Sequence, residues 1–211
     1  MRASSRFFPW LKASLLLWLA TLASASRAIT PISIDNQSND NFTAAAEIFI
    51  DASGQLGPAD MAAHATEFRP LHADELGKIY DERPIWLRAR LHNTKTAPIE
   101  RWLVLDKTRV ESVTFYQAMG SSWSQSNSGM RVPQQDKPIN TTGVAFSIQL
   151  AAGEQRDVLL RVQSRTILDL GAKVWKIVDF LQARENRLQI ESVAMGGTLI
   201  AALVSLTLFF N

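Results

Sequence analysis

Apolar and polar side chains alternate with a period of two through the middle of the chain, which is typical of β-strands with one buried face. In IWLRARLHN, residues 85–93, Ile85, Leu87, Ala89 and Leu91 share one face. Similar runs predict six further strands. They lie within residues 44–51, 101–107, 109–117, 144–150, 156–165 and 172–180. Short strands at roughly ten-residue spacing, with few helices, predict an antiparallel sandwich or jelly roll.

The connections between these strands are rich in Gly, Pro, Ser and Asn. Residues 59–64 have the composition of one helical turn, and residues 120–143 predict an extended loop with room for a short strand. Residues 26–43 contain the polar run DNQSNDN and predict a flexible leader. The fold class that follows is all-β, with an antiparallel jelly-roll or β-sandwich domain over residues 44–179.

The first residues have the organisation of a secretory signal peptide. Cations without any acid precede an apolar run over residues 13–23, and small residues follow it. Cleavage after Ala25 or after Ala28 fits this pattern, and the apolar run is short for a membrane span. We therefore assign residues 1–25 to a signal peptide.

The other end of the chain has the length and composition of a membrane span. The segment from Ser192 to Phe210 has no charged residue, and about 20 residues at 1.5 Å each cross roughly 30 Å of hydrocarbon. We predict a linker over residues 180–191 and a transmembrane helix over 192–211; a buried core helix is the alternative. No Lys or Arg follows the span, so we expect the N-terminal part of a longer membrane protein. A signal peptide first and a span last place the intervening domain outside the cytoplasmic membrane.

Charge and residue types exclude several classes of function. Cleavage after Ala25 removes three of the 22 Lys and Arg and none of the 20 Asp and Glu, which leaves 19 cations against 20 acids. A nucleic-acid partner, which needs a concentrated cationic patch, is not expected. The chain has no cysteine, so it holds no disulfide scaffold or thiolate metal site. Its three histidines lack metal-ligand spacing, and no catalytic motif is present, so we predict no enzyme, metal or cofactor in this chain.

The polar face of residues 85–93 raises the main functional question, because its tryptophan lies among cations. The strand over residues 156–165 has a similar polar face. The candidate ligand-binding residues on the two faces are Trp86, Arg88, Arg90, His92, Arg161, Gln163 and Arg165. In one interpretation a loop covers Trp86, and acids such as Asp81, Glu82 or Glu111 pair with the arginines. In the other, the indole stacks on a sugar or other small ligand while guanidinium groups hold hydroxyls or carboxylates. Alternation alone fits both.

The order of these segments resembles a known family. IFIDASGQLGPADM, FRPL, IWLRARLHN, WLVLDKTRVESVTFYQ, FSIQL and LLRVQS lead into a Gly-containing apolar helix. This order is similar to the type 2 extracellular domain of bacterial seven-transmembrane receptors with diverse intracellular signalling modules (7TMR-DISM), over about residues 44–211. The resemblance implies a jelly-roll sensor domain, similar in shape to carbohydrate-binding modules. Longer members carry seven membrane helices and an output such as a diguanylate cyclase or histidine kinase.

We therefore predict a periplasmic ligand-sensing domain of a receptor in the bacterial inner membrane. Its expected partners are a small molecule, of carbohydrate or carboxylate type, the inner membrane, and a second copy of the chain in a homodimer. The alternative is a membrane-anchored protein-binding or adhesion module without signalling output. Titration with small molecules discriminates the two, because only the sensor should bind one.

Overall fold

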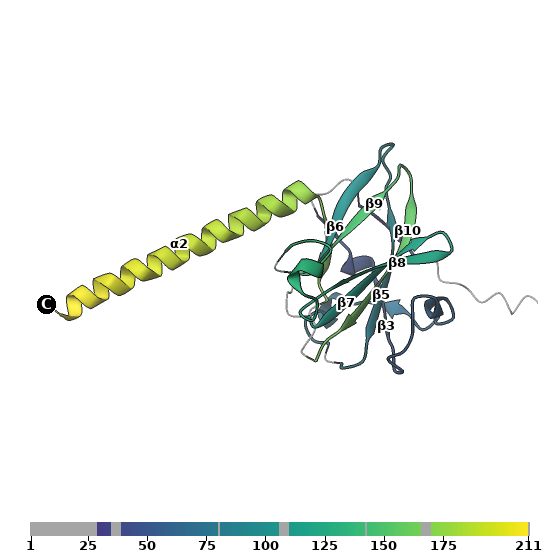
Figure 1. Cartoon of the computed structure of the whole chain (residues 1–211), viewed down its shortest axis with the longest axis horizontal. Helices are drawn as coiled ribbons and strands as arrows, with labels where there is room; N and C mark the ends of the chain where they lie inside the picture. Colours follow the sequence, from purple (N-terminus) through teal and green to yellow (C-terminus); the bar gives the residue numbers. More distant parts are fainter. Residues whose placement is uncertain are drawn as a thin grey trace, which may run out of the picture.

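In the part of the chain that the structure describes, a long helix projects from a β-sandwich (Figure 1). The computed structural model describes residues 29–34, 39–79, 81–105, 110–141, 143–165 and 170–210. The assigned signal peptide, residues 1–25, lies outside the described residues. The elements are β1 (Pro31–Ser33), β2 (Asn39–Asn41), β3 (Glu47–Ile50), β4 (Arg69–Pro70), β5 (Ile85–His92), β6 (Ile99–Leu105), β7 (Ser112–Met119), β8 (Ser122–Ser128), β9 (Ala145–Leu150), β10 (Gln155–Gln163), β11 (Ala172–Trp175) and α2 (Ile177–Phe209).

Two sheets form the sandwich. The large sheet has the order β4-β3-β5-β10-β7-β8, and the small sheet has the order β2-β11-β6-β9. Neighbouring strands are antiparallel, with one exception. Along the same edge of β5, β3 pairs with the first residues of β5 in antiparallel orientation, and β1 pairs with the last residues of β5 in parallel orientation. The predicted antiparallel sandwich is thus confirmed.

The core lies between the sheets and contains the apolar faces that alternation predicted. Ile85, Leu87 and Leu91 of β5 are each at most 1% exposed. Phe115 of β7 and Phe146 of β9 pack with ring centroids 5.2 Å apart, which joins the two sheets. Burial of this apolar surface, at about 25 cal/mol per Å², is the main stabilising contribution in a chain without disulfides.

Part of the predicted flexible leader belongs to the sandwich. Residues 31–33 and 39–41 form β1 and β2, and both Ile34 and Phe42 are fully buried. Thr43 donates a hydrogen bond from Oγ1 to the carbonyl oxygen of Leu170 at 2.9 Å. The segment is mostly polar, so its composition does not indicate that Ile34 and Phe42 are buried in the sandwich.

The long polar stretch over residues 120–143 contains the predicted short strand, β8. It is an edge strand that pairs with β7 alone, and most of its side chains face solvent. A solvent-facing edge strand needs few apolar residues, which explains its loop-like composition. The predicted helical turn over residues 59–64 is a 3₁₀ turn at Asp60–Ala62.

Helix α2 is continuous from the sandwich into the apolar segment, and the structure shows no separate linker over residues 180–191. Its first turn packs on the small sheet, where the Phe180 ring lies 5.6 Å from that of Trp102 and 5.9 Å from that of Trp175. The most apolar 18-residue window has a mean hydropathy of 1.9 and is not buried in the protein. The helix therefore has the length and composition of a membrane span.

Candidate ligand-binding face

The two strands that carry the candidate residues are neighbours in the large sheet. β5 and β10 are antiparallel, and their register sets Trp86 opposite Arg161 and Arg90 opposite Asp157. Since alternate residues of each strand point into the core, these side chains share the outer face of the sheet. The prediction that the two polar faces combine is therefore consistent with the register.

Trp86 is fully buried, although it lies on this outer face. Its ring stacks on that of Tyr116 at 5.6 Å, with an angle of 20° between the planes. A second, smaller apolar cluster surrounds it. This outer cluster consists of Met61, Phe68, Trp86, Tyr116 and Leu159, with Phe49, Leu56 and Trp123 packed against it. The indole is thus covered, as the first interpretation expects, and it is not open for stacking on a sugar.

The cover over Trp86 is the chain between β3 and β4, and Asp51 organises its start. The Asp51 carboxylate accepts hydrogen bonds from the backbone N–H groups of Ser53, Gly54 and Leu56 at 2.9 to 3.1 Å. Burial raises the pKa of Asp51, but the hydrogen bond from the Ser53 hydroxyl, at 2.6 Å, together with these backbone hydrogen bonds outweighs burial and holds the pKa below its ordinary 3.8. Arg161 then donates from Nη2 to the Gly54 carbonyl oxygen at 3.0 Å, which ties the cover to β10.

Arg88 is also part of this covered region. Its Nε donates to Glu47 Oε2 at 2.6 Å, and its Nη2 donates to the Ala65 carbonyl oxygen at 2.9 Å. The guanidinium carbon lies 4.1 Å from the centre of the Phe68 ring, and the residue is 9% exposed. A cation so enclosed and paired has a structural role in this conformation.

Arg90 lies at the rim of the face and forms a forked ion pair with Asp157, at 2.5 and 2.9 Å. The hydrogen bond to this carboxylate raises the pKa of Arg90. A shallow hollow of about 320 Å³ adjoins the pair. Its lining residues are Arg90, Ala118, Gly120, Glu154, Gln155, Arg156 and Asp157. His92 is half-buried nearby, opposite Gln155.

The expected partners of the arginines are different from those that form. Glu47 and Asp157, which are cross-strand neighbours of β5, pair with Arg88 and Arg90. Asp81 instead binds Arg83, two residues away. The cross-strand register decides these pairs, and a single sequence does not specify it.

The accessible half of the outer face lies over β10, β7 and β8. Arg161 and Gln163 are half-buried and Arg165 is exposed. On the adjoining strand β8, Gln125 and Asn127 are exposed and Trp123 is half-buried. Cross-strand pairing places Thr114 between Arg161 and Asn127. This half presents guanidinium, amide and aromatic groups, which recognise hydroxyls and carboxylates.

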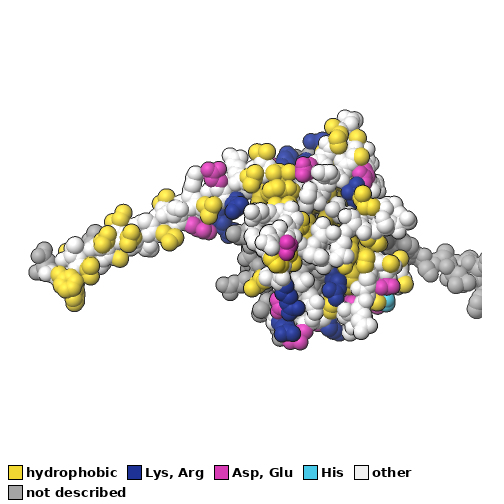
Figure 2. All heavy atoms as spheres, viewed as in Figure 1, with side chains coloured by type: hydrophobic (Ala, Val, Ile, Leu, Met, Phe, Trp, Pro, Cys, Tyr) yellow, Lys and Arg dark blue, Asp and Glu magenta, His cyan; other side chains and the backbone are white. Residues whose placement is uncertain are grey.

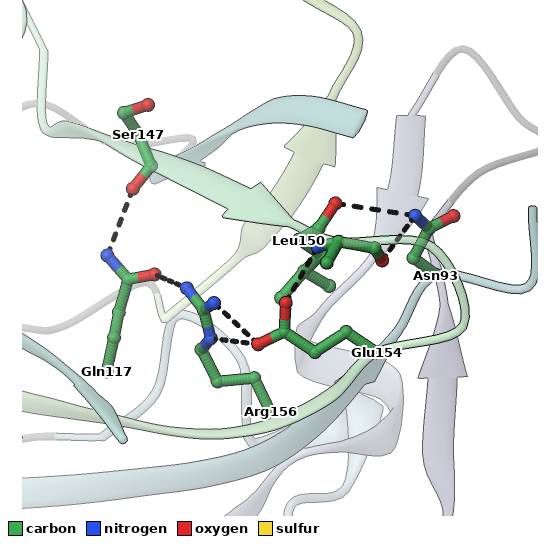
Figure 3. A network of polar contacts seen from close by, with 7 residues as sticks. Asn93, Gln117, Ser147, Leu150, Glu154 and Arg156 are labelled. Atoms are coloured by element: carbon green, nitrogen blue, oxygen red, sulfur yellow. Dashed lines mark hydrogen bonds and ion pairs between the residues drawn. The ribbon is translucent and has the colours of Figure 1, made fainter. Parts of the chain in front are cut away.

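A polar network that sequence reasoning missed fixes one end of the sandwich (Figure 3). Arg156 donates to Glu154 Oε1 at 2.5 and 2.9 Å and to Gln117 Oε1 at 3.3 Å, and Gln117 donates to the Ser147 carbonyl oxygen at 3.1 Å. Burial raises the pKa of Glu154, but hydrogen bonds from the backbone N–H of Ala151 and from Arg156 outweigh it, so the pKa is lowered. The network joins β10 and β7 of the large sheet to β9 of the small sheet.

Asn93, next to this network, closes the turn between β9 and β10. Its Nδ2 donates to the carbonyl oxygens of Ala97 and Ala151, each at 2.8 Å, and the residue is fully buried. A buried amide satisfied in this way holds the turn in place. In the sequence, the turn AAGEQ after a strand marks the place of the Arg156 network and of the Asn93 hydrogen bonds. It does not indicate which residues form these hydrogen bonds.

Comparison with known proteins decides the family. The model of the family described as 7TMR-DISM extracellular 2 matches residues 43–176, well over half of the chain. The chain belongs to this family. A search of the curated proteins finds no match.

The 7TMR-DISM extracellular 2 domain is a receptor sensor domain, and its family is non-catalytic. Together with the apolar helix α2, it indicates membrane anchoring with the domain outside the cytoplasm. Among the described residues, no group of three or more His, Asp or Glu side chains is arranged to hold a metal ion.

Proposed function

We propose that this 7TMR-DISM extracellular 2 domain is a periplasmic ligand sensor of the bacterial inner membrane. A signal peptide over residues 1–25 exports it, and the sandwich has the jelly-roll form. Ligand occupancy passes through α2 and further membrane helices to a cytoplasmic output of diguanylate cyclase or histidine kinase type.

The direct junction between the sandwich and α2 is the observation that supports this proposal most strongly. The helix begins two residues after β11, and Phe180 packs against Trp102 and Trp175 of the small sheet. A change in the packing of the two sheets therefore has a short physical route to the membrane span. The size of any such shift is limited by the difference in ligand affinity between the two arrangements.

The proposed ligand is a small carbohydrate or carboxylate that contacts the accessible half of the outer face. Arg161, Gln163 and Arg165 supply hydrogen-bond donors there, and Trp123 supplies the aromatic surface. Arg90 and His92 form the rim of this face. Trp86 and Arg88 support it from beneath the cover and do not contact the ligand. The proposed site thus keeps the predicted face and changes the aromatic contact.

Isothermal titration of the full chain in nanodiscs against panels of sugars and carboxylates tests this function. We expect a ligand to bind the wild type and to bind Gln163→Ala at least about tenfold more weakly, because one good hydrogen bond to a charged group contributes about 1.5–3 kcal/mol. Arg69→Gln is the control, since Arg69 is an exposed arginine paired with Glu75 and lies on β4, at the opposite edge of the large sheet from β8. Absence of small-molecule binding, with capture of a defined protein partner, would favour the adhesion module instead.

A further inference from the structure

A cleft of about 550 Å³ lies where α2 leaves the sandwich, separate from the candidate ligand-binding face. One wall is the small sheet and the adjoining loop, and the other is the first turns of α2. The lining includes Trp175, Phe180, Arg184, Arg187, Leu188 and Glu191. The cleft thus combines an apolar interior with two arginines and one carboxylate, and its volume is within the range of small-molecule sites.

The position of this cleft relative to a bilayer follows from the helix geometry. The last charged residue of α2 is Glu191, so the hydrocarbon region begins near Ser192. At 1.5 Å per residue, Arg187 lies about 7.5 Å and Arg184 about 12 Å from that boundary along the helix. The headgroup region extends roughly 5–8 Å beyond the hydrocarbon on each side. The long arginine side chains therefore reach the level of the lipid headgroups.

The charged residues of α2 all lie in its first half, between Asp179 and Glu191, and the far end of the helix carries no charged side chain (Figure 2). In the described part of the chain, Arg184 forms no ion pair. Arg187 lies 3.6 Å from Glu191, and both side chains are largely exposed, so the pair is weak. The cleft lining therefore carries two cations against one acid.

We propose that this cleft binds the headgroup of an anionic phospholipid from the leaflet that faces the sandwich. The planar guanidinium forks of Arg184 and Arg187 match the oxygens of a phosphate group. Leu188, about 6 Å from the boundary along the helix, contacts the glycerol, whereas Trp175 and Phe180 line the part of the cleft farther from the bilayer and cover the outer side of the headgroup. The bound lipid fills the space between α2 and the small sheet and fixes the height of the sensor above the membrane.

Retention of lipid by the purified full chain tests this proposal. The protein is exchanged into detergent with equal amounts of phosphatidylglycerol and phosphatidylcholine, and bound lipid is measured by native mass spectrometry. We expect the wild type to retain phosphatidylglycerol preferentially. In the Arg184→Gln/Arg187→Gln variant, the ratio of bound phosphatidylglycerol to bound phosphatidylcholine should fall at least about tenfold. Both arginines are exposed, so the variant should fold normally, and circular dichroism checks this. The single variant Arg184→Gln should show an intermediate loss.

Two controls make the result specific. Arg83→Gln removes an exposed arginine that does not line the cleft and should retain phosphatidylglycerol like the wild type. Soluble glycerol phosphate should not displace the lipid at an equal concentration; displacement would indicate a site for free anions and overturn the lipid assignment. Equal retention of the two lipids by the wild type, or unchanged retention by the double variant, would also overturn it. No sensory ligand is present in this assay, so its outcome is independent of the proposed function.

Discussion

Replacement of Trp86 by alanine should destabilise the sandwich strongly, because the indole closes the outer cluster. Truncation of a buried Trp costs about 3–5 kcal/mol, and loss of the stacked pair with Tyr116 is part of this cost. Among the described residues the indole Nε1 has no hydrogen-bond partner, and its removal relieves a penalty of about 1–3 kcal/mol. We therefore expect a net loss of about 2 kcal/mol, a substantial share of the roughly 5–15 kcal/mol typical of a domain.

Urea unfolding of the full chain in detergent, followed by far-UV circular dichroism, measures this loss. Trp123→Ala is the matched control, because Trp123 is only half-buried at the edge of the same cluster and should cost less. Trp86→Phe keeps a ring and removes the unpartnered N–H, so it should lie between the wild type and Trp86→Ala. An unchanged unfolding midpoint for Trp86→Ala, together with lost ligand binding, would show that the indole is a ligand contact and refute the packing argument.

Three further predictions concern the cover and the turns. Glu47→Gln should destabilise the protein by about 3–5 kcal/mol in urea unfolding, because it leaves the buried cation of Arg88 without its countercharge; a stability equal to that of the wild type would contradict this. The Asp51→Asn variant should be less stable than the wild type at neutral pH. The lowered pKa of Asp51 means that its contribution is present above pH 3.8 and is lost as the pH falls through the folded-state pKa, so the two unfolding curves should converge in acid; a constant difference would be inconsistent. Gly129→Ala should cost more than Gly120→Ala in thermal unfolding, because both have positive φ but a Cβ at Gly129 would lie 2.7 Å from a backbone oxygen; equal losses would argue against the close approach.

The strands of the core could be predicted because their alternation reports a buried face directly. Ile85, Leu87 and Leu91 occupy the interior as the period of two requires. The cover over Trp86 could not be predicted, since the chain over residues 51–68 has no periodicity that identifies what it packs against. The same limit applies to ion pairs, because the partners of Arg88 depend on cross-strand register and on the course of the cover.

Composition predicted too little ordered structure in polar segments that pack on the sandwich through only a few apolar residues. Ile34 and Phe42 tie the predicted leader into the sandwich, and β8 forms an edge strand from Ser, Gln and Asn. The predicted linker over residues 180–191 is helical because it contains good helix formers and neither Gly nor Pro. Its contribution to the cleft beside α2 depends on where the small sheet ends, which the sequence does not indicate.

We expect the membrane-anchored sandwich to display the accessible half of its outer face outside the cytoplasm. The chain has no cysteine, so a single introduced thiol reports its position without background. Gln125→Cys, at an exposed position of β8, is treated in intact cells with a membrane-impermeant maleimide. We expect labelling without permeabilisation of the inner membrane. Labelling only after the inner membrane is permeabilised would place the sandwich in the cytoplasm and overturn the proposed periplasmic location.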